Sequence, residues 1–278
     1  METPNEPSIN PYQTPTVPVL QETPAVDTAN FIAAGRTLGA GSGLDWLTAA
    51  WGLFVQAPVI WIVMLVIYLL FVTAINVLPF GGLVGTVLFG IVAAGWLAGA
   101  HAVAGGEKLE VEHLFAGFKS KTSPLVALGA LYAGALVILM VLVVIALVVA
   151  VIGVSGASGE IGNLLSGDTK QIGDLIQSSV MALVLVLLIG MALLIPIMMA
   201  AWFAPALIYF HDVPPLEALK TSFMACLRNF LPFLVLGVVA TLMFVVAIIP
   251  LFLGLLVAVP VWMIAAYTSY RAVFTQEG

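Results

Sequence analysis

The feature that most constrains this chain is a run without a charged residue, from Phe233 to Tyr270. A helix needs about 20 apolar residues to cross a hydrocarbon core of ~30 Å, so this run is long enough for two crossings. Charged residues make up 8% of the chain and apolar residues 62%, whereas soluble domains have roughly 25% and 45–50%. A soluble fold of 278 residues would leave too much of that apolar surface in water. The sequence therefore predicts an all-α protein that crosses a membrane several times.

Six apolar segments predict about six transmembrane helices in three pairs, which form one helical membrane domain over 39–274. Their approximate bounds are 57–78, 80–103, 124–154, 178–209, 233–249 and 251–270. A Pro/Thr-rich cytoplasmic tail, expected to be disordered, precedes this domain at 1–38, and a short tail follows at 275–278. The turns at 76–82 and 250–254 are almost without polar residues. Two interpretations of their hairpins stay open: simple spanning, which the length of the arms favours, and re-entrant hairpins shielded by protein.

Small residues and prolines inside these segments indicate close packing and bending. The second crossing carries two small-xxx-small pairs, which permit close contact between helices. Prolines in the fourth and sixth crossings remove a backbone donor and predict kinks. The glycines are Gly81, Gly85, Gly95 and Gly99, and the prolines are Pro196, Pro205 and Pro260. A sizeable polar loop, 155–177, separates the third and fourth crossings.

An amphipathic segment precedes each pair, at about 43–58, 109–124 and 213–232. The third is the clearest, because large apolar residues recur at helical spacing along it. This stripe consists of Leu216, Leu219, Phe223, Cys226, Leu227 and Phe230, and the opposite side carries Glu217, Lys220, Thr221 and Arg228. We expect three helices lying at the cytoplasmic interface. The Ser222 hydroxyl is expected to bond a preceding carbonyl of its own helix, and Asn229 to end this helix or cap the next.

The distribution of cations predicts the orientation of the chain. Seven of the eight Lys and Arg residues fall on the side that carries both termini, and only Lys170 falls opposite. Because loops rich in Lys and Arg stay in the cytoplasm, both termini are expected to be cytoplasmic.

The same residues speak against several classes of chemistry. No Asp, Glu, Lys or Arg lies inside a predicted crossing, although proton relays and ion-coupled carriers usually need one there. A formal charge of −6 argues against nucleic-acid binding, and Cys226, the single cysteine, excludes an intrachain disulfide and a cysteine-based metal cage. The spacing of His101, His113 and His211 matches no zinc signature. We therefore expect no metal, cofactor or catalytic residue.

A polar rim at the cytoplasmic end remains as the candidate interaction surface. Its members are Lys220, Arg228, Asn229, Glu217, Glu112 and His211. Solvation of a helix surface is the commoner reason for such residues to be present.

Ala218-Leu219-Lys220-Thr221-Ser222-Phe223, with Arg228-Asn229-Phe230 and Pro232 beyond it, resembles a recurring segment of uncharacterised bacterial inner-membrane proteins with about six crossings. The chain is more distantly similar to the membrane domain fused to some glycerophosphodiester phosphodiesterases. The resemblance implies a bacterial inner-membrane location and a six-helix fold. It carries no catalytic residue over, because the phosphodiesterase part with its metal carboxylates is absent from this sequence. Near the start, 10–15 resembles a short NPYxxP tag of other bacterial membrane proteins.

The sequence leaves two main hypotheses for function. The first is a non-catalytic membrane scaffold, assembly or partner-binding protein, with three interfacial helices as a collar around a six-helix bundle. The second is a transporter or channel for a neutral or lipidic substrate that uses the proline kinks as gates. An enzyme acting on lipids through Glu112, His211 or Glu217 is the weakest alternative. The expected partners are the lipid bilayer and, as further candidates, another membrane protein or a second copy of the chain.

Overall fold

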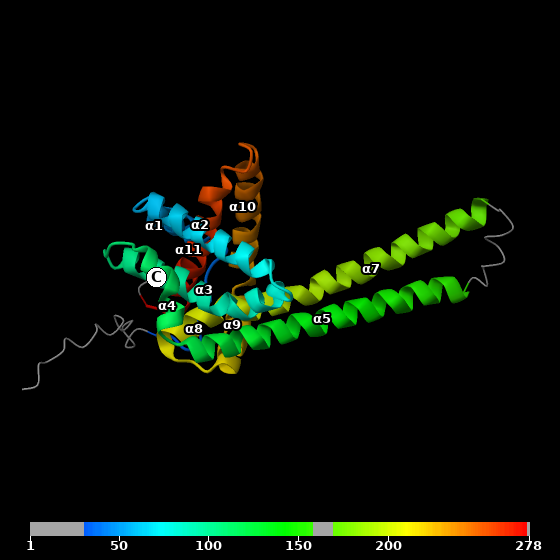
Figure 1. Cartoon of the computed structure of the whole chain (residues 1–278), viewed down its shortest axis with the longest axis horizontal. Helices are drawn as coiled ribbons and strands as arrows, with labels where there is room; N and C mark the ends of the chain where they lie inside the picture. The colour runs from blue at the N-terminus through cyan, green and yellow to red at the C-terminus, as the bar shows by residue number, and fades with distance from the viewer. Residues whose placement is uncertain (1–30, 158–168, 277–278) are drawn as a thin grey trace, which may run out of the picture.

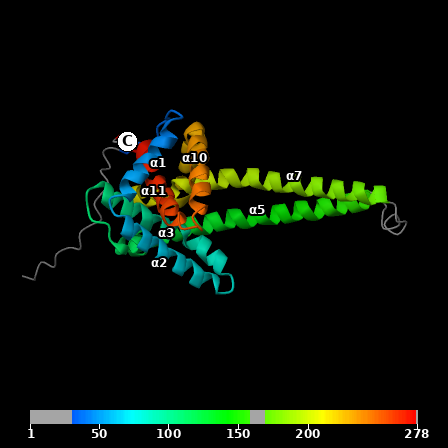
Figure 2. The same ribbon diagram turned by 90° about the horizontal axis from the view of Figure 1, so that it is seen from above.

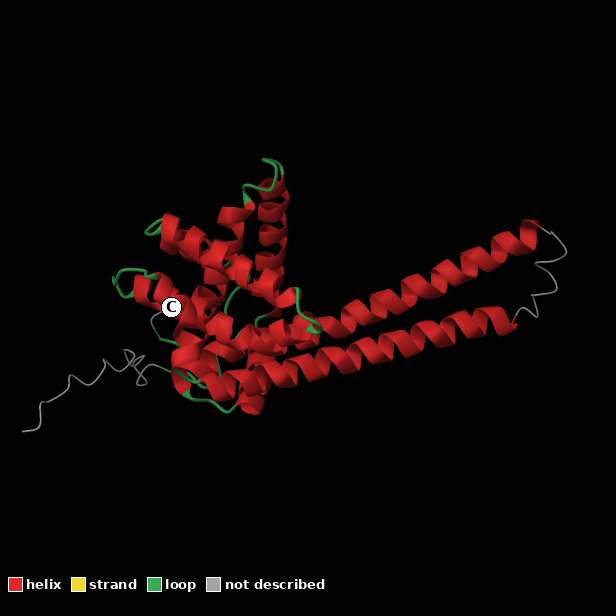
Figure 3. Cartoon of the chain, in the orientation of Figure 1, coloured by secondary structure: helices red, strands yellow, loops and turns green. Residues whose placement is uncertain are grey.

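The computed structural model describes residues 31–157 and 169–276. Within these ranges the regular elements are helices, apart from one β-bridge between Phe31 and Thr275 (Figure 3). The predicted all-α class is therefore confirmed. In chain order the helices are α1 (Ser42–Phe54), α2 (Pro58–Asn76), α3 (Gly81–Ala104), the 3-10 helix η2 (Val111–Phe115), α4 (Ala116–Lys119), α5 (Thr122–Ala157), α7 (Thr169–Trp202), α8 (Ala204–His211), α9 (Pro215–Arg228), α10 (Phe230–Ile248) and α11 (Leu255–Phe274). The expected disorder at 1–30 and the NPYxxP tag lie outside the described residues.

Among the residues that the structure describes, six helical segments are long and apolar enough to cross a membrane, as predicted. They are Pro58–Asn76, Gly81–Ala104, Thr122–Ala150, Val180–His211, Phe230–Ile248 and Leu255–Phe274. Both ends of the predicted loop 155–177 are helical instead, because α5 extends to Ala157 and α7 begins at Thr169. The polar residues that suggested a loop there alternate with Ile172, Leu175 and Ile176 at helical spacing, which is compatible with a longer helix.

α5 and α7 form a long hairpin that projects from a body made by the other helices (Figures 1 and 2). They contain 36 and 34 residues, so each is about 50 Å long at 1.5 Å per residue. In both views α10 runs across the direction of this hairpin. The α5–α7 hairpin and α10 therefore point in different directions, whereas the sequence suggested a six-helix bundle.

The segments that precede the helix pairs contact helices of a different pair. α1 packs against α10 and α11, η2 and α4 pack against α3, and α9 packs against α7 and α8. The contacts of η2 and α4 with α3, and of α9 with α7 and α8, are between elements that are close in sequence. The contacts of α1 with α10 and α11 are between the two ends of the chain. These contacts close a ring at the end of the body where Phe31 and Thr275 meet.

The second of these segments differs from the continuous helix that we expected. It consists of the short η2 and α4, and its backbone lies against α3. Glycine makes this approach possible, because a Cβ on Gly95 would collide with the Leu114 carbonyl and a Cβ on Gly117 with the Ile91 carbonyl. Gly99 is also tightly packed, with its Cβ position 2.9 Å from Leu109 Cδ1.

The other two glycines of the predicted packing motif have different surroundings. Gly81 is the first residue of α3, directly after the turn, and a Cβ there would collide with the carbonyl of Ile75. A Cβ at Gly85 would meet nothing within 4 Å. The two glycines therefore differ: Gly81 lies against the last turn of α2, whereas Gly85 makes no close helix contact.

The described structure includes residues 31–38, which lie before the domain boundary at 38/39 that the sequence suggested. Residues 31–41, which we call the strap, run along the end of α11. Ile32 N–H donates to the Phe274 carbonyl at 2.8 Å and Arg36 N–H to the Val273 carbonyl at 2.8 Å. These contacts join residues that are far apart in the chain. They produce no periodic pattern within the strap, so they could not be predicted from the sequence.

Candidate functional site

α9 has three faces where the sequence suggested two. Its small residues are buried against α7 and α8: Ala218, Ser222, Ala225 and Cys226. Of the predicted apolar stripe, Leu216 is 71% exposed and Leu227 50% exposed. Glu217 and Lys220 are exposed on the remaining, polar face. The helix thus packs on the protein through small side chains, while Leu219 and Phe223 are half-buried and Leu216 and Leu227 are exposed.

Ser222 is inserted into a break between α7 and α8. α7 ends at Trp202 and α8 begins at Ala204, shortly before Pro205, whose ring cannot follow an unbroken helix. The freed Phe203 N–H donates to Ser222 Oγ at 2.9 Å, and Ser222 Oγ donates to the Met199 carbonyl at 2.7 Å. The hydroxyl therefore replaces a missing bond of the neighbouring helix. Our expectation that it bonds its own helix was wrong.

The other two predicted kink prolines lie inside continuous helices. α7 runs through Pro196 and α11 through Pro260 without a break. Of the three prolines, Pro205 is the one at which the helical assignment is interrupted.

Cys226 lies one turn beyond Ser222 on the buried face of α9. It is 1% exposed, and its Sγ lies 3.4 Å from the Met199 carbonyl oxygen. Burial raises the pKa of the Cys226 thiol to about 12, although a hydrogen bond with Ser222 opposes this shift. A thiol with so high a pKa is inert as a nucleophile at neutral pH.

Asn229 joins the strap to the junction of α9 and α10. Its Oδ1 accepts the Leu38 N–H at 2.8 Å, and its Nδ2 donates to the carbonyls of Arg36 and Ala225 at 2.8 and 2.9 Å. The side chain is completely buried. Asn229 follows α9 as predicted, but it is not available at the surface of the rim.

Two arginines fix the position of the strap: Arg36 within it and Arg228 at the end of α9. The Arg36 guanidinium donates to the Ala272 carbonyl at 2.7 and 3.1 Å, and Arg228 Nη1 donates to the Ala34 carbonyl at 2.9 Å. Arg228 thus uses one of its donors within the chain. Both interactions pair a cation with backbone carbonyls, so they set the position of the strap without an acidic partner.

Two histidine–tyrosine pairs join the helices near the strap, and one of them, His211–Tyr270, contacts it through Phe31. His211 Nε2 and the Tyr270 hydroxyl are 2.5 Å apart, and His101 Nδ1 and the Tyr267 hydroxyl are 3.0 Å apart. Phe31 stacks on the His211 ring with a centroid distance of 3.7 Å. His101, His211 and both tyrosines come from the ends of α3, α8 and α11, so the pairs join three helices. Within the described ranges, no three His, Cys, Asp or Glu side chains gather as a metal site.

The remaining charged rim residues form ion pairs at the surface or face solvent. Lys119 Nζ donates to Glu112 at 2.8 Å, and this hydrogen bond lowers the pKa of the Glu112 carboxyl. Lys121 pairs with Asp212. The structure therefore separates the predicted rim: Asn229, His211 and Arg228 contribute to internal contacts, whereas Glu217, Lys220 and Glu112 stay exposed.

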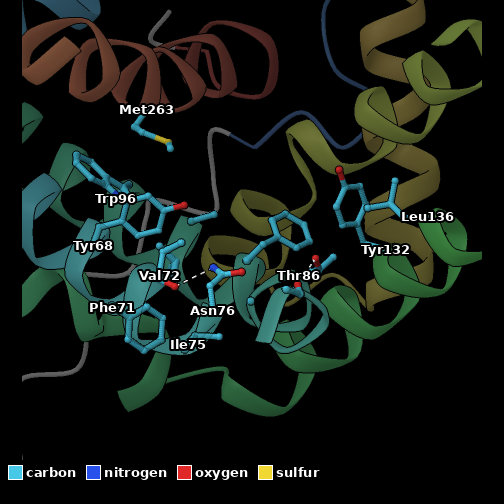
Figure 4. Close-up of a pocket in the computed structure, with 15 residues that line it drawn as sticks. Tyr68, Phe71, Val72, Ile75, Asn76, Thr86, Trp96, Tyr132, Leu136 and Met263 are labelled. Carbon is cyan, nitrogen blue, oxygen red and sulfur yellow. Dashed lines mark hydrogen bonds between the residues drawn. The ribbon is translucent and has the colours of Figure 1, made fainter. Parts of the chain in front are cut away.

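A second candidate site is a cavity of about 480 Å³ between α2 and α3 (Figure 4). Its wall follows one face of α2 from Tyr68 to Asn76 and one face of α3 from Gly82 to Trp96. α5 adds Tyr132 and Leu136, and α11 adds Met263. The residues on each helix recur at three- and four-residue spacing, so the cavity is elongated along both helices.

The cavity wall is apolar with a few uncharged polar groups. Asn76 Nδ2 donates to the Val72 carbonyl at 2.8 Å, and Thr86 Oγ1 to the Gly82 carbonyl at 2.8 Å. Trp96 is 2% exposed, and its Nε1–H has no hydrogen-bond partner in the described chain. This cavity was not predicted from the sequence. The residues that could have indicated it are Gly85 and the polar aromatic residues Tyr68, Trp96 and Tyr132, which lie within predicted crossings.

Comparison with known proteins agrees with a membrane protein. A probable inner membrane protein of Burkholderia thailandensis is 27% identical over 201 residues, which are 72% of this chain and 72% of that protein. No family model matches the chain, and no solved structure matches it. The membrane-length helices of the described residues and this relative support a multi-pass integral membrane protein.

Proposed function

We propose that the protein is a non-catalytic scaffold of the bacterial inner membrane, with both termini and the ring of α1, η2, α4 and α9 at the cytoplasmic surface. In this arrangement each of the three units is an interfacial segment followed by a helical hairpin. The positive-inside rule supports the orientation, since seven of the eight cations belong to this end. The exposed apolar face of α9 would then rest in the lipid interface.

The observation that carries the proposal is the use of buried polar groups for assembly. Ser222 connects α9 to α7, and Asn229 connects the strap to the α9–α10 junction. Because these groups are engaged within the chain, the polar surface left for a partner on α9 is the face of Glu217 and Lys220. We infer that a partner protein docks on this charged face of α9, which the ring of interfacial segments holds in place.

A photo-crosslinking residue at Lys220 in intact cells tests the scaffold proposal. We expect one discrete protein adduct, weakened when Glu217 is changed to Lys. The same crosslinker at Leu227, on the lipid-facing side of α9, is the matched control and should give no such adduct. Equal adducts at both positions, or none at Lys220, would contradict docking on this face.

A carrier of a neutral or lipidic substrate is the second candidate, and the cavity between α2 and α3 favours it. The cavity lies between two membrane-length helices, and none of the residues that line it is charged. Reconstituted protein should then exchange a fluorescent diacylglycerol between the leaflets of proteoliposomes. A rate equal to that of protein-free vesicles would exclude this activity. The distant similarity to phosphodiesterase-linked membrane domains remains a prediction, and no residue role depends on it.

A further inference from the structure

We propose that two copies of the chain pair through α9, antiparallel and side by side, with Glu217 of one copy against Arg228 of the other. The inference rests on the proposed scaffold function and deepens it, because it names the partner that docks on the exposed side of α9 as a second copy of the same chain.

Four residues of α9 form a stripe along its exposed side. They are Glu217, Thr221, Met224 and Arg228, with Glu217 in the first turn of the helix and Arg228 in the last. The two charged residues are exposed, Met224 is 39% exposed and Thr221 is half-buried. Their spacings of four, three and four residues are those of a seam between two packed helices. The stripe is therefore the part of α9 that can receive a second helix.

The stripe is complementary to itself when the second copy runs in the opposite direction. In an antiparallel pair centred on the stripe, Glu217 meets Arg228 of the other copy, and Thr221 meets Met224. Two-fold symmetry repeats each contact, so two ion pairs flank two inner layers. A parallel pair would instead place like charges beside each other at both ends. The antiparallel pair also sets the positive end of each helix dipole beside the negative end of the other.

The two charged residues are available for this contact. Glu217 takes part in no ion pair within the described ranges. Arg228 Nη1 donates to the Ala34 carbonyl at 2.9 Å, but a guanidinium group has five N–H donors. The strap thus orients the Arg228 side chain and leaves donors for the carboxylate of a second copy.

The position of the stripe suits contact between two copies in one membrane. Leu216 and Leu227 are 71% and 50% exposed, and at about 100° per residue they point roughly a right angle away from the stripe. With these leucines in the lipid interface, the stripe faces sideways along the membrane surface. Two copies of the same topology can share a two-fold axis only along the membrane normal, and this rotation makes two flat helices antiparallel. The symmetry that the membrane allows is therefore the one that the charges favour.

The test measures self-association of the full-length protein in vesicles of phosphatidylethanolamine and phosphatidylglycerol. Copies carry a donor or an acceptor dye on a C-terminal tag, and energy transfer is followed as the protein-to-lipid ratio rises. We expect saturable energy transfer for the unchanged sequence. Glu217→Arg alone, or Arg228→Glu alone, turns both ion pairs into like-charge pairs, so half-maximal transfer should need at least about fourfold more protein per lipid.

Mixing the two variants is the decisive measurement. Donor-labelled Glu217→Arg and acceptor-labelled Arg228→Glu carry complementary charges on both sides of the axis, so the mixture should recover the association of the unchanged protein. A variant that only misfolds is not rescued in this way. Asp45→Arg is the matched control, because Asp45 is likewise an exposed acidic residue in the first turn of an interfacial helix, α1. It should leave association unchanged.

The absence of saturable transfer in the unchanged protein, or of recovery in the mixture, would overturn the pairing of copies. Equal weakening by Asp45→Arg would overturn it as well, since the effect would not belong to the stripe. The photo-crosslinking experiment at Lys220 separates this result from the proposed function. An adduct with a different protein, without self-association, leaves docking on α9 in place and contradicts the pairing of copies. The absence of both adduct and self-association contradicts both proposals.

Discussion

At the scale of single residues, the polar groups near the strap act as internal connectors. Ser222, Asn229 and Arg228 belong to the segment that resembles other bacterial membrane proteins, and each reaches a different part of the chain. These side chains form hydrogen bonds with backbone groups that have no partner within their own helix, because a helix ends or breaks there. The residues that carry this resemblance therefore include three that connect separate parts of the fold.

Replacing Ser222 by Ala should destabilise the protein. The change leaves the Phe203 N–H and the Met199 carbonyl without their bridging hydroxyl, at an expected cost of about 1–3 kcal/mol in the free energy of unfolding. A thermal unfolding curve in detergent measures the shift. Thr221→Ala, on the neighbouring and less buried position, is the control and should change the midpoint little. Identical midpoints for the two variants would contradict the bridging role.

Cys226 should be silent toward maleimide in the folded protein. Its thiol is buried, and a pKa of about 12 keeps it protonated at pH 7 to 8, whereas the thiolate is the reactive form. Unfolding exposes the thiol and restores an ordinary pKa, so labelling should follow denaturation. The measurement is the fraction modified before and after unfolding. Fast labelling of the native protein would show that α9 does not stay packed against α7.

At the scale of elements, glycine decides how closely the second interfacial segment approaches α3. The short η2 and α4 lie flat on α3 because Gly95 and Gly117 remove the side chains between the backbones. The residue type alone did not distinguish these contacts from the open position at Gly85. Gly85 and Gly95 occupy equivalent places in the small-xxx-small pattern. They differ in that a neighbouring backbone lies against Gly95 and none lies against Gly85.

Substituting Ala at two glycines of α3 should therefore have opposite effects. Gly95→Ala forces the Leu114 backbone to move, and overpacking of this kind costs about 1–3 kcal/mol. Gly85→Ala meets open space and should be neutral or stabilising by up to about 1 kcal/mol, the difference in helix propensity. The exposure of Cys226 to a thiol-reactive dye on heating provides the readout. Equal loss of stability at both positions would contradict the described packing of η2.

At the scale of the whole molecule, the divergent hairpins raise the question of how each one meets the bilayer. α2 and α3 end in the turn at 76–82 and α10 and α11 in the turn at 250–254, and α10 runs across the α5–α7 hairpin (Figure 1). Asn76 and Phe252 are exposed in these turns. Each pair is nevertheless long enough to span, since α2 and α10 both contain 19 residues and about 20 suffice.

Single cysteines at Asn76 and Phe252 test the spanning interpretation. We expect a membrane-impermeant maleimide to label both from the outer side of intact cells. The native Cys226 is buried, so it should contribute little background. A tag at the C-terminus should be reached only after the membrane is opened. If both turns stay unlabelled while a single cysteine placed between residues 158 and 168 is labelled, re-entrant hairpins are favoured.

The sequence by itself determined the class of the protein and the position of its six apolar helices. Hydrophobic length is a local property, and the cost of leaving polar backbone in lipid makes a helix the outcome for each apolar segment. Only the tertiary structure decided that Ser222 completes α7, that Asn229 fastens the strap and that α1 closes the ring. It also placed Trp96 at a cavity. These outcomes join residues far apart in the chain, and their energies depend on which backbone groups are left unpaired at each contact, which no periodic pattern records.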